Sequence, residues 1–276
     1  MSLVTRRRSA AVAVAALVLP LAAACGSSDD SGKKADAGSS ASAAAPSASS
    51  SSGSAPAANL TVLAAASLTD VFKTAGDTYM KENPGTKLAF SFAGSQDLVA
   101  QVKQGAPADV LVTADTKTMD SAKSEVDVPT VIAKNRLVIV TQKGNPDHVT
   151  SLKDLANPKL SVVLAAPSVP VGNYADQVLK KQHVTVHPKS EETDVRSVLT
   201  KVETSADAGI VYKTDAATAT DKVDAVTIPD AQNAVASYPA AALKDSKQSA
   251  AAQAFVKWLS TPEAQSILQK AGFQQP

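Results

Sequence analysis

The sequence has little cysteine, few aromatic residues and almost no net charge. Its single cysteine, Cys25, excludes an internal disulfide framework and a zinc site built from several cysteines. A formal net charge of +1 at pH 7 excludes a strongly basic nucleic-acid-binding protein, so we expect no nucleic-acid partner. One Trp, four Tyr and five Phe are too few for base-stacking platforms or for a sugar-binding cleft lined by rings. The three histidines, His148, His183 and His187, stand in polar stretches without other metal ligands, which predicts surface positions.

The first 25 residues have the pattern of an export signal. Arginines at positions 6–8 precede an uncharged apolar run over residues 10–24, which is shorter than the ~20 residues that a transmembrane helix needs. The run ends in Ala-Ala-Ala-Cys-Gly, which resembles the cleavage site of bacterial lipoproteins, where the cysteine becomes the lipidated first residue. We therefore expect lipidation at Cys25 and a protein held on the outer face of the cytoplasmic membrane. An ordinary signal peptide is the alternative, and both the general and the twin-arginine export routes stay open.

A stretch of small and polar residues follows over residues 26–58. It consists almost entirely of Ser, Ala, Gly, Asp, Lys and Pro, without an aromatic or large aliphatic side chain. Such a segment cannot bury enough apolar surface to offset the entropy lost on ordering, so it predicts a flexible linker. The folded part is therefore expected over residues 59–276.

The pattern of residues 59–276 predicts alternating strands and helices. Strands are predicted from short apolar runs at residues 60–65, 88–92, 109–113, 136–141, 161–165 and 209–212. Helices are predicted at residues 68–82, 96–104, 116–124, 171–181 and 194–204, and as a pair over 246–270 hinged near Pro262. This order indicates an α/β protein with mixed, mostly parallel sheets flanked by helices, and its length suits two small lobes.

Four predicted helices begin directly after strands or turns, at Ser67, Ser95, Val171 and Asp194. The first turn of a helix carries unpaired backbone N–H groups and a partial positive charge. If these starts meet in one cleft, they form an anion site without a fixed cation. The simpler alternative is that the two serines only cap their helices, Ser67 through a capping box with Asp70.

Arg196 is the cation closest to these helix starts. An arginine in the first turn of a helix is opposed by the helix dipole. We therefore expect Arg196 to pair with a carboxylate, either Asp194 or one across the cleft, rather than to contact a ligand.

A series of short motifs runs along residues 59–276 in a fixed order. The motifs are Ala-Ala-Ala-Ser-Leu at 64–68, Ser-Phe-Ala-Gly-Ser at 91–95, Gly-Ala-Pro-Ala-Asp-Val at 105–110, Asn-Arg-Leu at 135–137, Val-Pro-Val-Gly at 169–172, Asp-Val-Arg at 194–196, Gly-Ile-Val-Tyr at 209–212 and Tyr-Pro at 238–239. This ordered set resembles the molybdate-binding proteins of bacterial ABC importers. The resemblance implies a two-lobed periplasmic-binding-protein fold of type II, with the ligand in the cleft between the lobes. The first lobe is then expected over residues 59–138 and 225–276, and the second over 139–224.

The resemblance also implies which groups hold the ligand. Ser67 and Ser95 would each donate a hydroxyl and a backbone N–H, Val171 and Val195 a backbone N–H, and Tyr212 its phenol O–H. These donors would contact the oxygens of molybdate or tungstate, with no direct coordination of the metal, no catalytic residue and no cofactor. The implied partner is the membrane permease of an ABC importer, and the implied state is a monomer. Taken alone, Tyr212 in its apolar strand would instead be a core tyrosine.

Two alternatives stay open. The first is a binding protein of the same fold for another oxyanion or a small solute, because sulfate has the charge and shape of molybdate and differs in size. The second is a secreted serine hydrolase with Ser67 or Ser95 as nucleophile. The sequence lacks Gly-x-Ser-x-Gly, and its histidines have no triad spacing, which disfavours the hydrolase.

Overall fold

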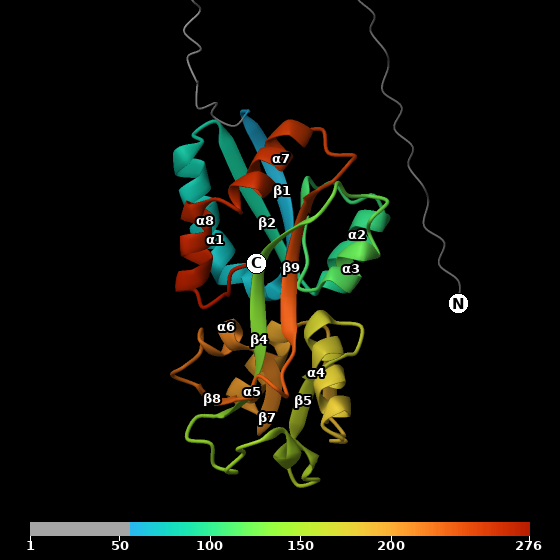
Figure 1. Ribbon diagram of the computed structural model, residues 1–276, viewed down its shortest axis with the longest axis vertical. Helices are drawn as coiled ribbons and strands as arrows, with labels where there is room; N and C mark the ends of the chain where they lie inside the picture. Colours follow the sequence, from blue (N-terminus) through green and yellow to red (C-terminus); the bar gives the residue numbers. More distant parts are fainter. Residues whose placement is uncertain (1–55) are drawn as a thin grey trace, which may run out of the picture. The chain divides into compact units, whose positions relative to one another are not determined.

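The computed structural model describes residues 56–276, so the expected signal, Cys25 and nearly all of the expected linker lie outside the described residues. This part of the chain is arranged in two lobes, which are joined by the strands β4 (Thr130–Gln142) and β9 (Val235–Ala242) (Figure 1). The described strands form one mixed sheet that continues through both lobes. Among the helices of residues 56–276, none has the length and apolar character that crossing a bilayer requires.

The first lobe is built around β1 (Ala58–Ala65), which pairs in parallel with β2 (Thr86–Ala93) and β3 (Val110–Val112). Alternate residues of β1 belong to different cores, because Val62 packs in the cluster that includes α1, whereas Leu63 packs in the cluster that includes α2. Both faces of this sheet are therefore covered, as expected for parallel strands. The helices of this lobe are α1 (Thr69–Glu82), α2 (Ser95–Lys103), α3 (Thr116–Asp120), α7 (Ser249–Trp258) and α8 (Pro262–Lys270), and a 3-10 turn, η1 (Ala66–Leu68), precedes α1.

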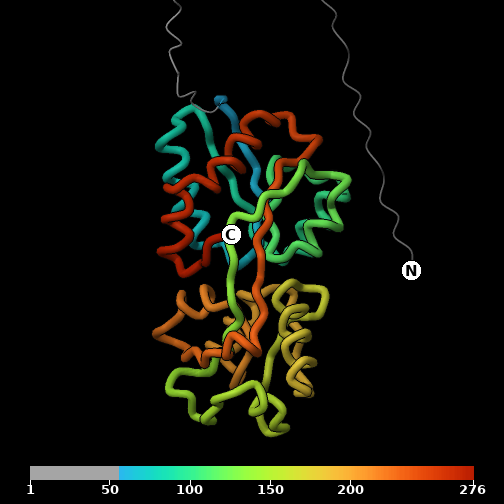
Figure 2. Tube along the Cα trace, in the orientation of Figure 1, coloured from blue at the N-terminus to red at the C-terminus, as the bar shows by residue number. Residues whose placement is uncertain are grey.

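The second lobe has its own parallel strands. β5 (Val162–Ala165) pairs in parallel with β6 (Ser190–Glu192) and with β7 (Ala208–Tyr212), and every residue of β5 and β7 is buried. β7 and β8 (Val223–Thr227) run antiparallel to β4. The helices are α4 (Pro170–Lys181), α5 (Val195–Thr204) and α6 (Lys213–Ala216), with a 3-10 helix, η2 (Leu152–Ala156). The carboxyl ends of β5 and β7 face the first lobe, so the segments that follow them reach the junction between the lobes (Figure 2).

Strand β4 belongs to both lobes. Its residues 130–136 pair with β9, and its residues 137–142 pair with β7 and β8. This pairing favours a crossing between Arg136 and Leu137, close to the expected boundary at 138. The chain was expected to pass back into the first lobe at residue 225. That residue lies inside β8, which pairs with the second-lobe half of β4. The pairing therefore favours a passage back at the start of β9 instead.

Most sequence-predicted elements lie within about two residues of the observed ones, and the C-terminal helices are separated at Thr261–Pro262 as expected. Three differences stand out. The predicted strand 136–141 begins six residues earlier, the predicted helix 116–124 ends at Asp120, and β6, β8 and β9 were not predicted. β9 contains Pro239 and a run of alanines, both unfavourable for a strand in isolation, and pairing with β3 and β4 overrides this preference.

Candidate ligand-binding site

A small pocket lies where the two lobes meet, and all five residues expected to hold the ligand line it. The space open to the centre of a water-sized sphere inside the pocket is about 10 Å³. The pocket therefore admits only a small ligand, since sites for drug-sized ligands typically measure ~300–1,000 Å³. The lining residues are Ala65, Ala66, Ser67, Ala93, Gly94, Ser95, Ala114, Val169, Pro170, Val171, Asp194, Val195 and Tyr212.

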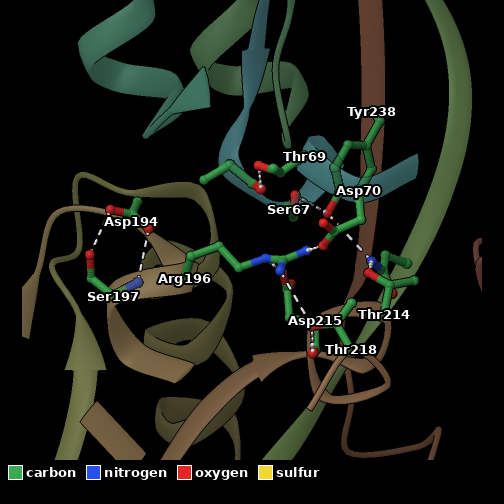
Figure 3. Close-up of polar contacts among 12 residues, drawn as sticks. Ser67, Thr69, Asp70, Asp194, Arg196, Ser197, Thr214, Asp215, Thr218 and Tyr238 are labelled. Carbon is green, nitrogen blue, oxygen red and sulfur yellow. Dashed lines mark hydrogen bonds and ion pairs between the residues drawn. The ribbon is translucent and has the colours of Figure 1, made fainter. Parts of the chain in front are cut away.

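Ser67 follows β1 in the 3-10 turn η1, and its hydroxyl contacts a residue far along the chain. Its Oγ lies 3.1 Å from the Oη of Tyr238 on β9, and the Nδ2 of Asn135 donates to the same Oη at 3.4 Å (Figure 3 draws Ser67 and Tyr238). An amide nitrogen can only donate, so the Tyr238 hydroxyl accepts from Asn135 and can donate its own proton to Ser67. In that arrangement the proton of Ser67 is available to the pocket. The alternative of a capping box with Asp70 is wrong, since neither η1 nor α1 has a side-chain cap.

Ser95 is the first residue of α2 and is buried. Its Oγ accepts a hydrogen bond of 3.0 Å from the backbone N–H of Ala114, which follows β3. The alternative of a capping role is wrong here too, because α2 has no side-chain cap. Since the oxygen is used as an acceptor, the hydroxyl proton remains free to donate into the pocket. The sequence gave no signal for this role of Ala114, because its contribution is a backbone group that orients Ser95.

Val171 and Val195 stand in the first turns of α4 and α5. Helix α4 begins at Pro170, and α5 begins after Asp194, whose Oδ1 accepts from the N–H of Ser197 at 3.0 Å. The N–H groups of a first turn have no partner inside the helix, so the backbones at Val171 and Val195 supply donors at the pocket. A Cβ on Gly172 would lie 2.1 Å from the carbonyl oxygen of Ala166, which shows how closely α4 approaches the end of β5.

Tyr212 ends β7, and its side chain is only 1% exposed. Among the described residues its buried Oη has no hydrogen-bond partner, although the residue lines the pocket. An unsatisfied buried hydroxyl is costly, and because this one lines the pocket, it is a donor available to a ligand there. Burial raises the pKa of the Tyr212 phenol well above its usual value, so the group stays protonated and acts as a donor.

Within the described residues, neither lysine nor arginine lines this pocket. The nearest cation, Arg196, extends between two carboxylates in Figure 3. Its Nη2 lies 2.8 Å from Oδ2 of Asp70 on α1, and its Nε lies 2.6 Å from Oδ1 of Asp215 on α6. The expected pairing with a carboxylate across the cleft is confirmed, whereas Asp194 caps its own helix. Burial raises the pKa of Asp215 to about 7, and Arg196 opposes this rise.

The arrangement lacks the contacts of a serine hydrolase. The two serine hydroxyls contact Tyr238 and the N–H of Ala114. His148, His183 and His187 are exposed, as expected from the sequence. In residues 56–276 no group of three His, Cys, Asp or Glu side chains could hold a metal ion. Uncharged donors that face one another without a nucleophile and base are suited to holding an anion.

Two lobes joined by paired strands, with a donor-lined pocket between them, have the architecture of a solute-binding protein. The comparisons with known proteins agree. The family of bacterial extracellular solute-binding proteins matches residues 60–274, and the chain belongs to this family.

The chain is similar to several known proteins. It is 42% identical to the molybdate-binding protein ModA of Mycobacterium tuberculosis over 224 residues, which cover 80% of this chain and 86% of that protein. The periplasmic molybdate-binding protein of Azotobacter vinelandii has a similar fold, with a TM-score of 0.67, 21% identity, and coverage of 79% of this chain and 99% of that one. The sulfate-binding protein SubI of Mycobacterium tuberculosis also shares the fold, with a TM-score of 0.69, 21% identity, and coverage of 79% and 87%.

Proposed function

We propose that this protein captures molybdate, and equally tungstate, as the solute-binding component of an ABC importer. The observation that carries the proposal is the buried Oη of Tyr212, which lines the pocket without a partner. The 42% identity to a molybdate-binding protein over most of both chains supports the choice of ligand. Molybdate and tungstate are nearly identical in size, so a pocket that recognises their oxygens binds both.

The chemistry of the pocket suits a fully deprotonated oxyanion. Such a dianion offers acceptors only, and Ser67, Ser95, Val171, Val195 and Tyr212 would offer roughly seven donors. Hydrogen bonds to a charged group contribute ~1.5–3 kcal/mol each, or ~10–20 kcal/mol in total. Association and ordering cost ~4–15 kcal/mol, which leaves enough for micromolar to nanomolar binding without a lysine or arginine.

The proposal includes the setting of the protein. We place it on the outer face of the cytoplasmic membrane, held by a lipid on Cys25, with the linker over residues 26–58 as its tether. A permease of the importer would recognise the lobes when they close on the ion. The protein acts as a monomer and needs no cofactor, since every proposed contact comes from this chain.

A second candidate is sulfate, and the structural similarity to a sulfate-binding protein is the reason to test it. Thermal unfolding with molybdate, tungstate, sulfate and phosphate separates the candidates. At a concentration of 100 times Kd, a ligand stabilises the protein by about 2.7 kcal/mol. For a domain of this size this raises the Tm by roughly 5–10 °C. We expect this rise with molybdate and tungstate and much smaller rises with sulfate and phosphate. A flat response to all four anions would refute an oxyanion-binding function, and loss of the rise in Ser67→Ala assigns it to this pocket.

A further inference from the structure

Arg196 connects the two lobes beside the pocket. It extends from α5 of the second lobe and contacts Asp70 on α1 of the first lobe, with 2.8 Å between Nη2 and Oδ2 (Figure 3). Asp215, which belongs to the second lobe like Arg196, is completely buried and holds the Nε of Arg196 at 2.6 Å. The Nη1 of Arg196 donates to Thr218 at 3.3 Å. The second lobe therefore holds the guanidinium in position, and its remaining nitrogen is directed to the first lobe.

A second contact between the lobes joins Gln96, which follows the proposed donor Ser95, to Thr193 of the second lobe. The Nε2 of Gln96 on α2 donates to the carbonyl oxygen of Thr193 at 2.8 Å. Gln96 directly follows Ser95, and Arg196 directly follows Val195, so both contacts adjoin proposed ligand donors in the sequence. Each contact joins residues from different lobes, so each exists only when the lobes are close together.

We propose that Arg196 and Asp70 form a latch that sets ligand affinity by stabilising the closed arrangement in which the donors of both lobes meet. The inference rests on the proposed function, because it explains how a pocket without cations keeps its two halves together. Asp215 and Thr218 fix the arginine before closure, so little side-chain entropy is lost when its free nitrogen reaches Asp70. The latch does not touch the ion, and Asp70 and Arg196 act as positioning residues.

The decisive variant is Asp70→Asn, because it removes the contact between the lobes and keeps the pair of Arg196 and Asp215 intact. Replacing Arg196 itself would leave the buried Asp215 carboxyl without its partner and destabilise the fold. A loss of affinity in that variant could then result from unfolding. Asp70 is half-exposed, and partly exposed ion pairs are worth a factor of about two to five. We therefore expect Asp70→Asn to weaken molybdate binding about two- to fivefold by isothermal titration calorimetry at low salt, through faster dissociation. Asp70→Glu restores part of the affinity, and Asp70→Arg weakens binding further.

Affinities measured at low and at high salt distinguish a latch from a general loss of stability. At 0.5 M NaCl the affinities of wild type and Asp70→Asn should converge, because salt screens the ion pair in the wild type. The matched control is Lys222→Gln, which breaks the 3.1 Å pair of Lys222 and Glu203 within the second lobe and should leave affinity unchanged. Equal affinity of wild type and Asp70→Asn at low salt overturns the latch, as does a loss that is the same at both salt concentrations.

The failure of the latch is distinguishable from the failure of the proposed function. If wild type binds molybdate and Asp70→Asn binds equally, only the latch is wrong. If wild type binds none of the four anions, the proposed function is wrong. In that case small-angle X-ray scattering of the ligand-free proteins tests the latch, which requires a larger radius of gyration for Asp70→Arg than for wild type. Equal radii would overturn it.

Discussion

Replacing Tyr212 by phenylalanine removes one hydroxyl from the pocket and changes little else. In the structure this Oη is buried without a partner, and no other described group depends on it. With ligand bound, the phenol would donate to an oxygen of the anion, a hydrogen bond worth ~1.5–3 kcal/mol. Tyr212→Phe should therefore weaken molybdate binding by roughly 10- to 150-fold.

The same substitution should leave folding intact. Because the hydroxyl has no partner without ligand, its removal relieves an unsatisfied polar group instead of breaking a hydrogen bond. We expect the free energy of unfolding of ligand-free Tyr212→Phe to stay unchanged or to rise by up to about 1–3 kcal/mol. Calorimetric titration with molybdate measures the first effect, and urea unfolding without ligand measures the second.

Tyr79→Phe is a matched control. The Oη of Tyr79 is also buried without a hydrogen-bond partner, but it lies in the core of the first lobe, where its ring packs against Phe255 and Trp258. This variant should bind molybdate as tightly as wild type. Binding by Tyr212→Phe within twofold of wild type, or an equal loss in Tyr79→Phe, would show that the phenol of Tyr212 is not a ligand donor.

Three further predictions concern the same pocket. Ser95→Ala removes a donor and leaves the N–H of Ala114 without its acceptor, so affinity falls about tenfold or more and urea unfolding shows a loss of ~1–3 kcal/mol. Gly94→Ala places a Cβ 2.4 Å from the carbonyl oxygen of Thr193 in the other lobe, so calorimetry should show about 5- to 150-fold weaker binding with an unchanged urea midpoint. Burial raises the pKa of both Tyr212 and Tyr238 above the usual ~10, so affinity should stay constant between pH 8 and 9, above the pKa of about 7 of Asp215; a loss with a midpoint in that range would contradict neutral donors.

The position of the pocket followed from the sequence because its donors stand at helix starts. Ser67, Ser95 and Val195 stand two or three positions after the ends of β1, β2 and β6, and the carboxyl ends of strands are where ligands gather in open α/β sheets. Local pattern was therefore enough to single out these helix starts as a candidate anion site, and the resemblance of the short motifs assigned the individual donors. The resemblance of the short motifs supplied Tyr212, which periodicity alone assigned to the core.

The partners of those residues could not be predicted, because they lie far away in the sequence. The hydroxyl of Ser67 meets Tyr238, 171 positions further along, and the hydroxyl of Ser95 meets the backbone of Ala114. A local pattern favours the nearest partner, here the backbone N–H groups of the following turn, which is why capping was the simpler alternative for both serines. The carboxylate that pairs with Arg196 across the cleft was expected in kind, since the helix dipole disfavours an unpaired arginine there. Only the structure shows that this carboxylate belongs to Asp70.

The chain enters the second lobe through β4 and leaves it through β9, two neighbouring antiparallel strands. The residues between these crossings form one uninterrupted insert in the first lobe, and they carry Val171, Val195 and Tyr212, whereas Ser67 and Ser95 stay outside it. A single exchange of the coding sequence for this insert between two relatives therefore replaces the half of the pocket that carries Val171, Val195 and Tyr212. The half that carries Ser67 and Ser95 is retained. Recombination at the two strands gives this architecture a route to new anion preferences that does not require stepwise mutation of each donor.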